Sequence, residues 1–155
     1  MSKQLRDALI EALEDEYKAR ATYRLILSKF GAIRPFVNIV ESEERHIRAL
    51  IPLFQRYGYA LPEDTWQGRI TIPASVQEAC QEGVQAEIEN GAMYRRLLNL
   101  TTDYPDVQTV FLNLQRASQT RHLPAFQRCA ERGTIQTGQG GRGHGRHGRG
   151  CRHGA

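Results

Sequence analysis

The feature that most constrains the fold of this chain is a helical repeat of apolar residues in four long segments. In each segment such residues recur at spacings of three, four and seven, which is the pattern of an amphipathic helix with one face in a core. Leu5, Leu9 and Ala12 begin the first of these stripes. The repeat predicts an all-α fold, with helices over residues 4–30, 35–57, 75–101 and 107–131.

The links between these segments differ in length, and the difference predicts how the helices are connected. The first and third links are short, and short loops join antiparallel neighbours. The second link, residues 58–74, contains Gly58, Pro62, Gly68 and Pro73 and has no helical period. A link of this length can run from one end of a bundle to the other. We therefore expect an antiparallel four-helix bundle with one long crossover between the second and third helices.

Local signals predict where the last helix ends and where two helices bend. Gly133 follows the last apolar stripe and is a stop signal. The folded domain is therefore expected over residues 1–133. Pro52 and Pro124 fall inside predicted helices, where each removes an N–H donor and is expected to bend the helix.

Residues 134–155 have a different composition and are predicted to be a disordered tail. From residue 138 onward the chain holds eight Gly, four Arg, three His and Cys151. That segment has too few apolar groups to fold. Three interpretations stay open for the tail: weak nucleic-acid contact through its Arg-Gly repeats, metal scavenging through its histidines and cysteine, or a silent solubilising role.

The net charge of +4 comes from the tail and not from the folded part. Removing the four tail arginines from the 21 basic residues leaves 17, equal to the 17 acidic residues. The folded part is therefore neutral, and a basic face for nucleic acid is not expected there. Nucleic acid is expected as a partner only weakly, through the tail.

The cysteines and the N-terminal sequence suggest a cytoplasmic protein. Cys80, Cys129 and Cys151 are widely spaced, odd in number and form no C-x-x-C motif, so we expect no disulfide framework. Cys80 and Cys129 are expected to pack as small apolar residues. The N-terminus lacks the apolar core of a signal peptide, and no apolar run is long enough for a membrane span. No membrane partner is expected.

The strongest functional signal is a set of Glu and His residues on the inward stripes of all four helices. Glu43 and His46 form an E-x-x-H motif, and residues three apart on a helix share a face. Two-metal carboxylate sites in bundles take one Glu from each of two helices and a Glu-x-x-His pair from each of the other two. We predict a metal site from residues that fit this pattern: Glu16, Glu43, His46, Glu87 and His122.

The fourth helix departs from that pattern. Gln119, not Glu, stands three residues before His122, so the site has three carboxylates instead of four. Gln119 remains a candidate weak ligand through its amide oxygen. The departure predicts that the two halves of the site bind metal unequally, or that only one ion binds.

Tyr23 and Tyr94 each stand seven residues after a predicted ligand, Glu16 or Glu87. Their phenols can hydrogen-bond ligand carboxylates on neighbouring helices. Simple packing in the core is an equal alternative for both. An apolar pocket lined by Leu9, Val40 and Leu114 is expected beside the metal site.

The alternative to a metal site is that each acidic residue is solvated or paired with a nearby arginine, namely Arg20, Arg45 or Arg121. Taken together, the residues favour metal. Three buried carboxylates without a cation would each cost several kcal/mol, on the order expected for buried ions.

The motifs just described resemble those of a known family. Residues 16–23, the Glu43–His46 motif and the Glu87/Tyr94 pair look like the ligand helices of rubrerythrin-type ferritin-like proteins. The segment around His122, residues 117–126, is most similar to the family called domain of unknown function 2202. The resemblance covers about residues 5–131 and implies a ferritin-like bundle with a di-iron carboxylate centre.

That resemblance also implies a function. Such proteins reduce peroxide, oxidise ferrous iron or activate dioxygen, and manganese or zinc are alternative metals. This sequence lacks the rubredoxin-like cysteine quartet of complete rubrerythrins, so an external electron donor is expected. A homodimer is one arrangement left open. The alternative function is a non-enzymatic helical bundle with a degenerate metal site and a tail that contacts nucleic acid or metal.

Overall fold

Four long helical segments make up most of residues 2–138, the part of the chain that the computed structural model describes; side chains are described as far as residue 132. No strand occurs within residues 2–138, and the predicted all-α fold is confirmed. The first three segments are α1 (Lys3–Phe30), α2 (Phe36–Tyr57) and α3 (Val76–Leu100). The fourth is a continuous run of α4 (Pro105–Ala117), the π-helical turn η1 (Ser118–His122) and α5 (Leu123–Gly138).

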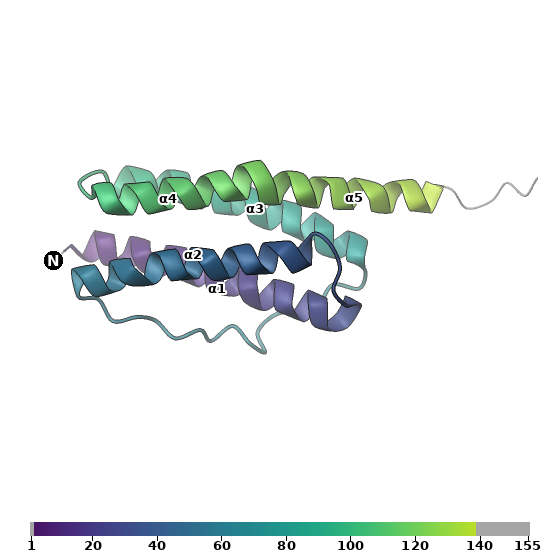
Figure 1. Ribbon diagram of the computed structural model, residues 1–155, viewed down its shortest axis with the longest axis horizontal. Coiled ribbons are helices and arrows are strands. Elements are labelled where there is room, and N and C mark those ends of the chain that lie inside the picture. The colour runs from purple at the N-terminus through teal and green to yellow at the C-terminus, as the bar shows by residue number, and fades with distance from the viewer. Residues whose placement is uncertain (1, 139–155) are drawn as a thin grey trace, which may run out of the picture.

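The helices lie side by side, and their directions follow from the links between them (Figure 1). α1 and α2 run in opposite directions, as do α3 and the α4–η1–α5 segment. The long link after α2 passes along the outside of the α1–α2 pair and returns the chain to the end where α2 began. The most extensive packing is within the pairs α1 with α2 and α3 with α5, while α1 also packs against α3.

Local sequence signals account for several helix ends. The Ser2 hydroxyl accepts a hydrogen bond from Leu5 N–H at 3.3 Å, and the Ser75 hydroxyl accepts one from Glu78 N–H at 3.1 Å. Each hydroxyl satisfies an N–H that has no partner within its helix. Gly58 ends α2 with φ of 71°, a left-handed conformation that glycine adopts without steric cost.

The fourth helical segment does not stop where the sequence predicted. The prediction that Gly133 ends it is wrong, because α5 continues to Gly138. A glycine within a helix costs about 1 kcal/mol relative to alanine, which weakens a helix without breaking it. Residues 134–138 are therefore helical, and the rest of the predicted tail lies outside the described residues.

Both internal prolines lie within continuous helical segments. α2 continues through Pro52, and Pro124 is the second residue of α5, two residues after the end of the π turn. In that turn the Leu123 N–H reaches back five residues to the Ser118 carbonyl. A π turn inside an α-helix is rare and is frequently found at functional sites.

The core is divided along the helix axes into two apolar clusters with polar residues between them. One cluster includes Leu13, Leu50, Leu97 and Phe111, and the other includes Phe36, Ala79 and Phe126. On each helical segment buried polar side chains lie where one cluster gives way to the other, and they are Glu16, Ser42, Glu43, His46, Glu87, Asn90, Ser118 and His122. The packing thus places a polar layer in the middle of an apolar core.

One cysteine prediction is wrong. Cys80 on α3 and Cys129 on α5 form a disulfide, with their Cα atoms 5.8 Å apart. Both residues are buried, as an apolar role would require. Their separation of 49 residues in sequence gave no sign of the bond; the antiparallel packing of α3 on α5 brings them into bonding range.

Within residues 2–138, no helix combines the length and the apolar composition that crossing a membrane would require.

Candidate metal centre

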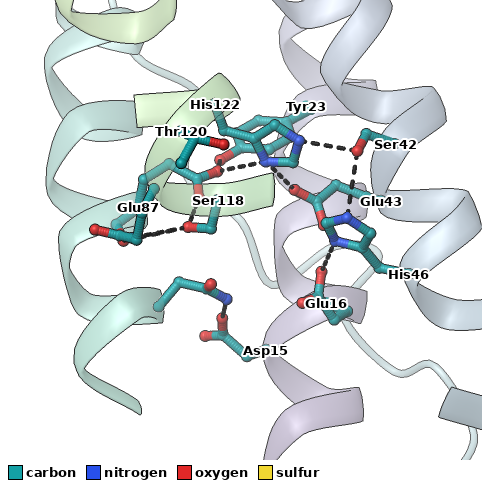
Figure 2. A network of polar contacts seen from close by, with 12 residues as sticks. Asp15, Glu16, Tyr23, Ser42, Glu43, His46, Glu87, Ser118, Thr120 and His122 are labelled. Atoms are coloured by element: carbon teal, nitrogen blue, oxygen red, sulfur yellow. Dashed lines mark hydrogen bonds and ion pairs between the residues drawn. The ribbon is translucent and has the colours of Figure 1, made fainter. Parts of the chain in front are cut away.

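The five predicted site residues meet in the polar layer, in two overlapping groups of three (Figure 2). Within each group one potential ligand atom per residue lies within 4.8 Å of the others. All five are buried, with at most 7% of any residue exposed. The groups are Glu16, Glu43 and His46, and Glu43, Glu87 and His122.

The first group joins α1 to α2. His46 Nδ1 lies 3.2 Å from Glu16 Oε2 and 3.3 Å from Glu43 Oε2. Glu43 and His46 are three residues apart on a regular α-helix, so both side chains reach the same point from one face.

The second group joins α2 to α3 and the π turn. His122 Nδ1 lies 3.3 Å from both Glu43 Oε1 and Glu87 Oε1. Glu43 therefore presents one oxygen to each group. It is the one residue that the two groups share.

Ser42 links the two histidines and was missed by the sequence analysis. Its hydroxyl lies 3.3 Å from His46 Nε2 and 2.9 Å from His122 Nε2, between the two rings (Figure 2). A serine oxygen can accept both ring N–H groups, and that arrangement leaves both Nδ1 atoms directed at the carboxylates. The available signal was its position: Ser42 precedes His46 by four residues and so shares its face.

Hydroxyl groups also fix the outer carboxylates. Tyr94 donates to Glu16 Oε1 at 2.6 Å, and Tyr23 donates to Glu87 Oε1 at 3.3 Å. Of the two alternatives left open for these tyrosines, the structure shows the one in which they hydrogen-bond carboxylates on neighbouring helices. The Ser118 hydroxyl also donates a hydrogen bond to Glu87 Oε2.

Gln119 belongs to neither group. Its amide N–H donates to the Glu87 main-chain carbonyl at 2.8 Å and to Ser118 Oγ at 3.1 Å. The π turn explains this position. Each hydrogen-bonded ring of a π-helix contains one more residue than in an α-helix, so Ser118, four residues before His122, takes the inward face that Gln119 would share in an α-helix.

Mutual contact shifts the pKa values of these groups in opposite directions. Burial and the neighbouring charge of Glu43 raise the pKa of Glu16 to about 8. Burial opposes the charging of the histidines, but the adjacent carboxylates outweigh it, raising the pKa of His46 to about 10 and that of His122 to about 9. Burial also acts to raise the pKa of Glu43, yet Glu16, His122 and His46 together lower it.

The alternative of arginine pairing does not hold for these carboxylates. Arg20 pairs with Glu44 at 3.1 Å and with Asp64 at 2.9 Å. Among residues 2–132, the ion pairs of Glu16, Glu43 and Glu87 are made with the two histidines. Glu43 Oε2 is buried without a properly directed hydrogen-bond partner. A buried carboxylate oxygen without a hydrogen-bond donor, in a group of three buried acids, fits a cation ligand.

A cavity of about 480 Å³ reaches this layer from the side of α1, α3 and the long link. Its walls include Tyr23, Glu43 and Glu87. Leu9, Val40 and Leu114, the expected lining, do not border this cavity. Asp15 and Asn90 also line the cavity, and the Asn90 amide donates to Asp15 Oδ2 at 2.7 Å.

Comparison with known proteins bears on the fold. No protein-family profile matches this chain, and no curated protein matches it at a significant level. Among solved structures, the chain is similar to hypothetical protein MJ0754 from Methanococcus jannaschii DSM 2661, with 27% sequence identity and a TM-score of 0.75. The match covers 86% of this chain and 83% of that one. Agreement over most of both chains means that they share an all-helical fold.

Proposed function

We propose that this protein is a ferritin-like metalloprotein that holds two metal ions, most simply iron, and uses them in redox chemistry. Peroxide reduction or ferrous iron oxidation is the proposed activity. The observation that carries the proposal is the pair of three-residue groups that share Glu43. The returning long link supports the ferritin-like part, since one long crossover distinguishes that bundle from a simple up-and-down one.

The donor set fits iron or a similar divalent metal. Glu16, Glu43 and His46 would hold one ion, and Glu43, Glu87 and His122 the other. Mixed carboxylate and imidazole ligands suit iron and manganese, and zinc is an alternative. A bound redox-active ion would supply electron transfer to and from dioxygen or peroxide.

The surrounding residues would keep the ligands in place. Ser42 holds both imidazoles with Nδ1 facing the carboxylates, which sets ring orientation and tautomer. Tyr94 holds Glu16, while Tyr23 and Ser118 hold Glu87. The cavity beside Glu43 and Glu87 would admit a small oxidant.

The second candidate function is a non-enzymatic bundle with a degenerate site. It is favoured by one observation: Gln119 contacts the α3 backbone and supplies no fourth ligand. In that case the histidines stay protonated against the carboxylates and no metal is required.

Metal analysis separates the two candidates. The full chain is purified, stripped, reloaded with ferrous iron, manganese or zinc, and its bound metal is counted. We expect two ions per chain, and an optical charge-transfer band once the iron is oxidised. No bound metal under any loading condition would leave the degenerate bundle as the function.

A further inference from the structure

We propose that Cys80 and Cys129 form a dithiol–disulfide couple that supplies two electrons for reducing a peroxide at the Glu/His centre. This inference rests on the proposed function. It assigns a role to the disulfide and gives the protein an electron source within its own chain.

The two cysteines lie on the same two helical segments as Glu87 and His122. α3 runs antiparallel to the η1–α5 segment (Figure 1), and three pairs of residues meet between them. His122 and Glu87 make the first pair, with Nδ1 and Oε1 3.3 Å apart. Phe126 lies against Gly83 in the second, and the disulfide is the third.

The middle pair allows the two helices to approach closely. A Cβ atom on Gly83 would lie 2.7 Å from the Phe126 ring, so no larger side chain fits there without displacing the ring. The phenylalanine ring thus fills the space between the ligand layer and the disulfide.

The distance from disulfide to centre is short. Each cysteine lies seven residues from a proposed ligand on its own helical segment, which is about 10 Å at 1.5 Å per residue. The Tyr23, Phe36 and Phe126 rings belong to the same apolar cluster as the cysteines, with centroids 5.2–5.7 Å apart. Tyr23 also donates to Glu87, so the cluster contacts the centre directly.

The chemistry balances without any further reactant. One hydrogen peroxide and two thiols give one disulfide and two waters. The O–O bond breaks, the S–S bond forms, and each thiol gives up one electron and one proton. An external dithiol would then reduce the disulfide for another turnover, with Cys129, 7% exposed, the more accessible partner.

The test counts thiols in the full chain carrying Cys151→Ser, so that only Cys80 and Cys129 contribute. The protein is reduced with a phosphine, desalted without oxygen, loaded with ferrous iron and given one equivalent of hydrogen peroxide. Free thiols are alkylated at intervals and counted by mass spectrometry. We expect two thiols lost per peroxide, at least about tenfold faster than in the metal-free protein, because buried thiols react poorly by themselves.

Three other outcomes have distinct meanings. Peroxide consumed by the loaded protein with both thiols intact would make the disulfide a structural cross-link and overturn the inference alone. Equal thiol loss with and without metal would mean direct oxidation and would also overturn it. If the chain binds no metal, the proposed function fails and the inference fails with it.

A paired variant provides a check that does not depend on thiol counting. Cys80→Ala with Cys129→Ala, verified as helical by circular dichroism, should bind metal and consume peroxide once. It should not be regenerated by a dithiol, whereas the Cys151→Ser protein should. Equal regeneration of the two proteins would overturn the inference.

Discussion

In the half of the centre built by α1 and α2, Glu43 and His46 lie one turn apart on a regular α-helix. In the other half, His122 ends a π turn whose inward neighbour is Ser118, and Gln119 turns toward the α3 backbone. The first half gains its second carboxylate from α1, and the second gains Glu87 from α3. The two halves thus present the same kinds of side chain, Glu and His, from different backbone conformations, a regular α-helix in one and a π turn in the other.

The two halves also differ in what holds their helices together. A disulfide joins α3 to α5 two turns from Glu87 and His122. Polar contacts at the edge of the α1–α2 pair include Arg20, which reaches Glu44 and Asp64. The second half therefore has a covalent support that the first lacks. Four predictions address these differences, from the largest expected effect to the smallest.

The shared ligand should matter most. Glu43→Ala removes a carboxylate from both groups, so we expect loss of both ions. Second-layer changes typically cost about 10–100-fold in metal affinity, and removal of a shared ligand should exceed that range. Metal content after dialysis measures the effect. Glu44→Ala, one residue along the same helix and outside both groups, is the matched control; retention of two ions by Glu43→Ala would refute the shared-ligand picture.

The metal-free protein should lose stability as the pH rises. The pKa values of Glu16, His46 and His122 are raised from 4.5, 6.5 and 6.5 to about 8, 10 and 9. The folded state therefore keeps protons that the unfolded chain has released. The free energy of unfolding falls wherever the folded state binds more protons.

The pH range of this loss of stability follows from the three raised pKa values. The raised pKa of Glu16 lowers the free energy of unfolding between pH 4.5 and about 8. The raised pKa values of the two histidines lower it from pH 6.5 to about 9 or 10. The steepest fall should lie between 6.5 and about 8, where all three contribute. Glu43, with a lowered pKa, acts oppositely and only at acid pH. Urea unfolding across this range measures the trend, bound metal should reverse it, and a flat profile would contradict it.

Reducing the disulfide should destabilise the whole domain. The bond closes a loop with a sequence separation of 49, for which chain entropy predicts about 4 kcal/mol. Denaturant unfolding with and without a phosphine measures the change, again with Cys151→Ser. A negligible change would mean that the packing of α3 on α5 alone supports the second half.

Gln119→Glu should not add a fourth carboxylate ligand to the metal centre. The side chain faces the α3 backbone, and the change removes its donation to the Glu87 carbonyl, costing about 1 kcal/mol. Gln115→Glu, which removes a similar donation to the Gly91 carbonyl, is the control. A rise in metal affinity for Gln119→Glu alone would show that the π turn can rearrange and make the two halves alike.

Much of the site could be predicted from sequence because it depends on helical periodicity. Glu16, Glu43, His46 and Glu87 fall on inward stripes of regular helices, and such stripes predict which faces meet. His122 was predicted in the same way. Its helix departs from the α period only within the π turn, which is why Gln119 was placed on the wrong face.

Spacing along the chain could not predict that Ser42 contacts both histidines or that Cys80 bonds to Cys129. Ser42 makes no recognisable motif, and its importance depends on two rings from different helices meeting at its hydroxyl. Cys80 and Cys129 have no short-range relation, and their bond exists because of the register between antiparallel helices. Gly133 is a local signal that predicted a helix end, yet α5 continues past it to Gly138.

The sequence by itself determined the helices, the long link and which carboxylates and imidazoles face inward, because these depend on the period of a single helix and on local chain chemistry. Only the tertiary structure decided that Ser42 spans the two histidines, that Gln119 turns away and that two distant cysteines bond. These features depend on register and rotation between helices, which are set by packing across the whole core and leave no periodic trace in the sequence.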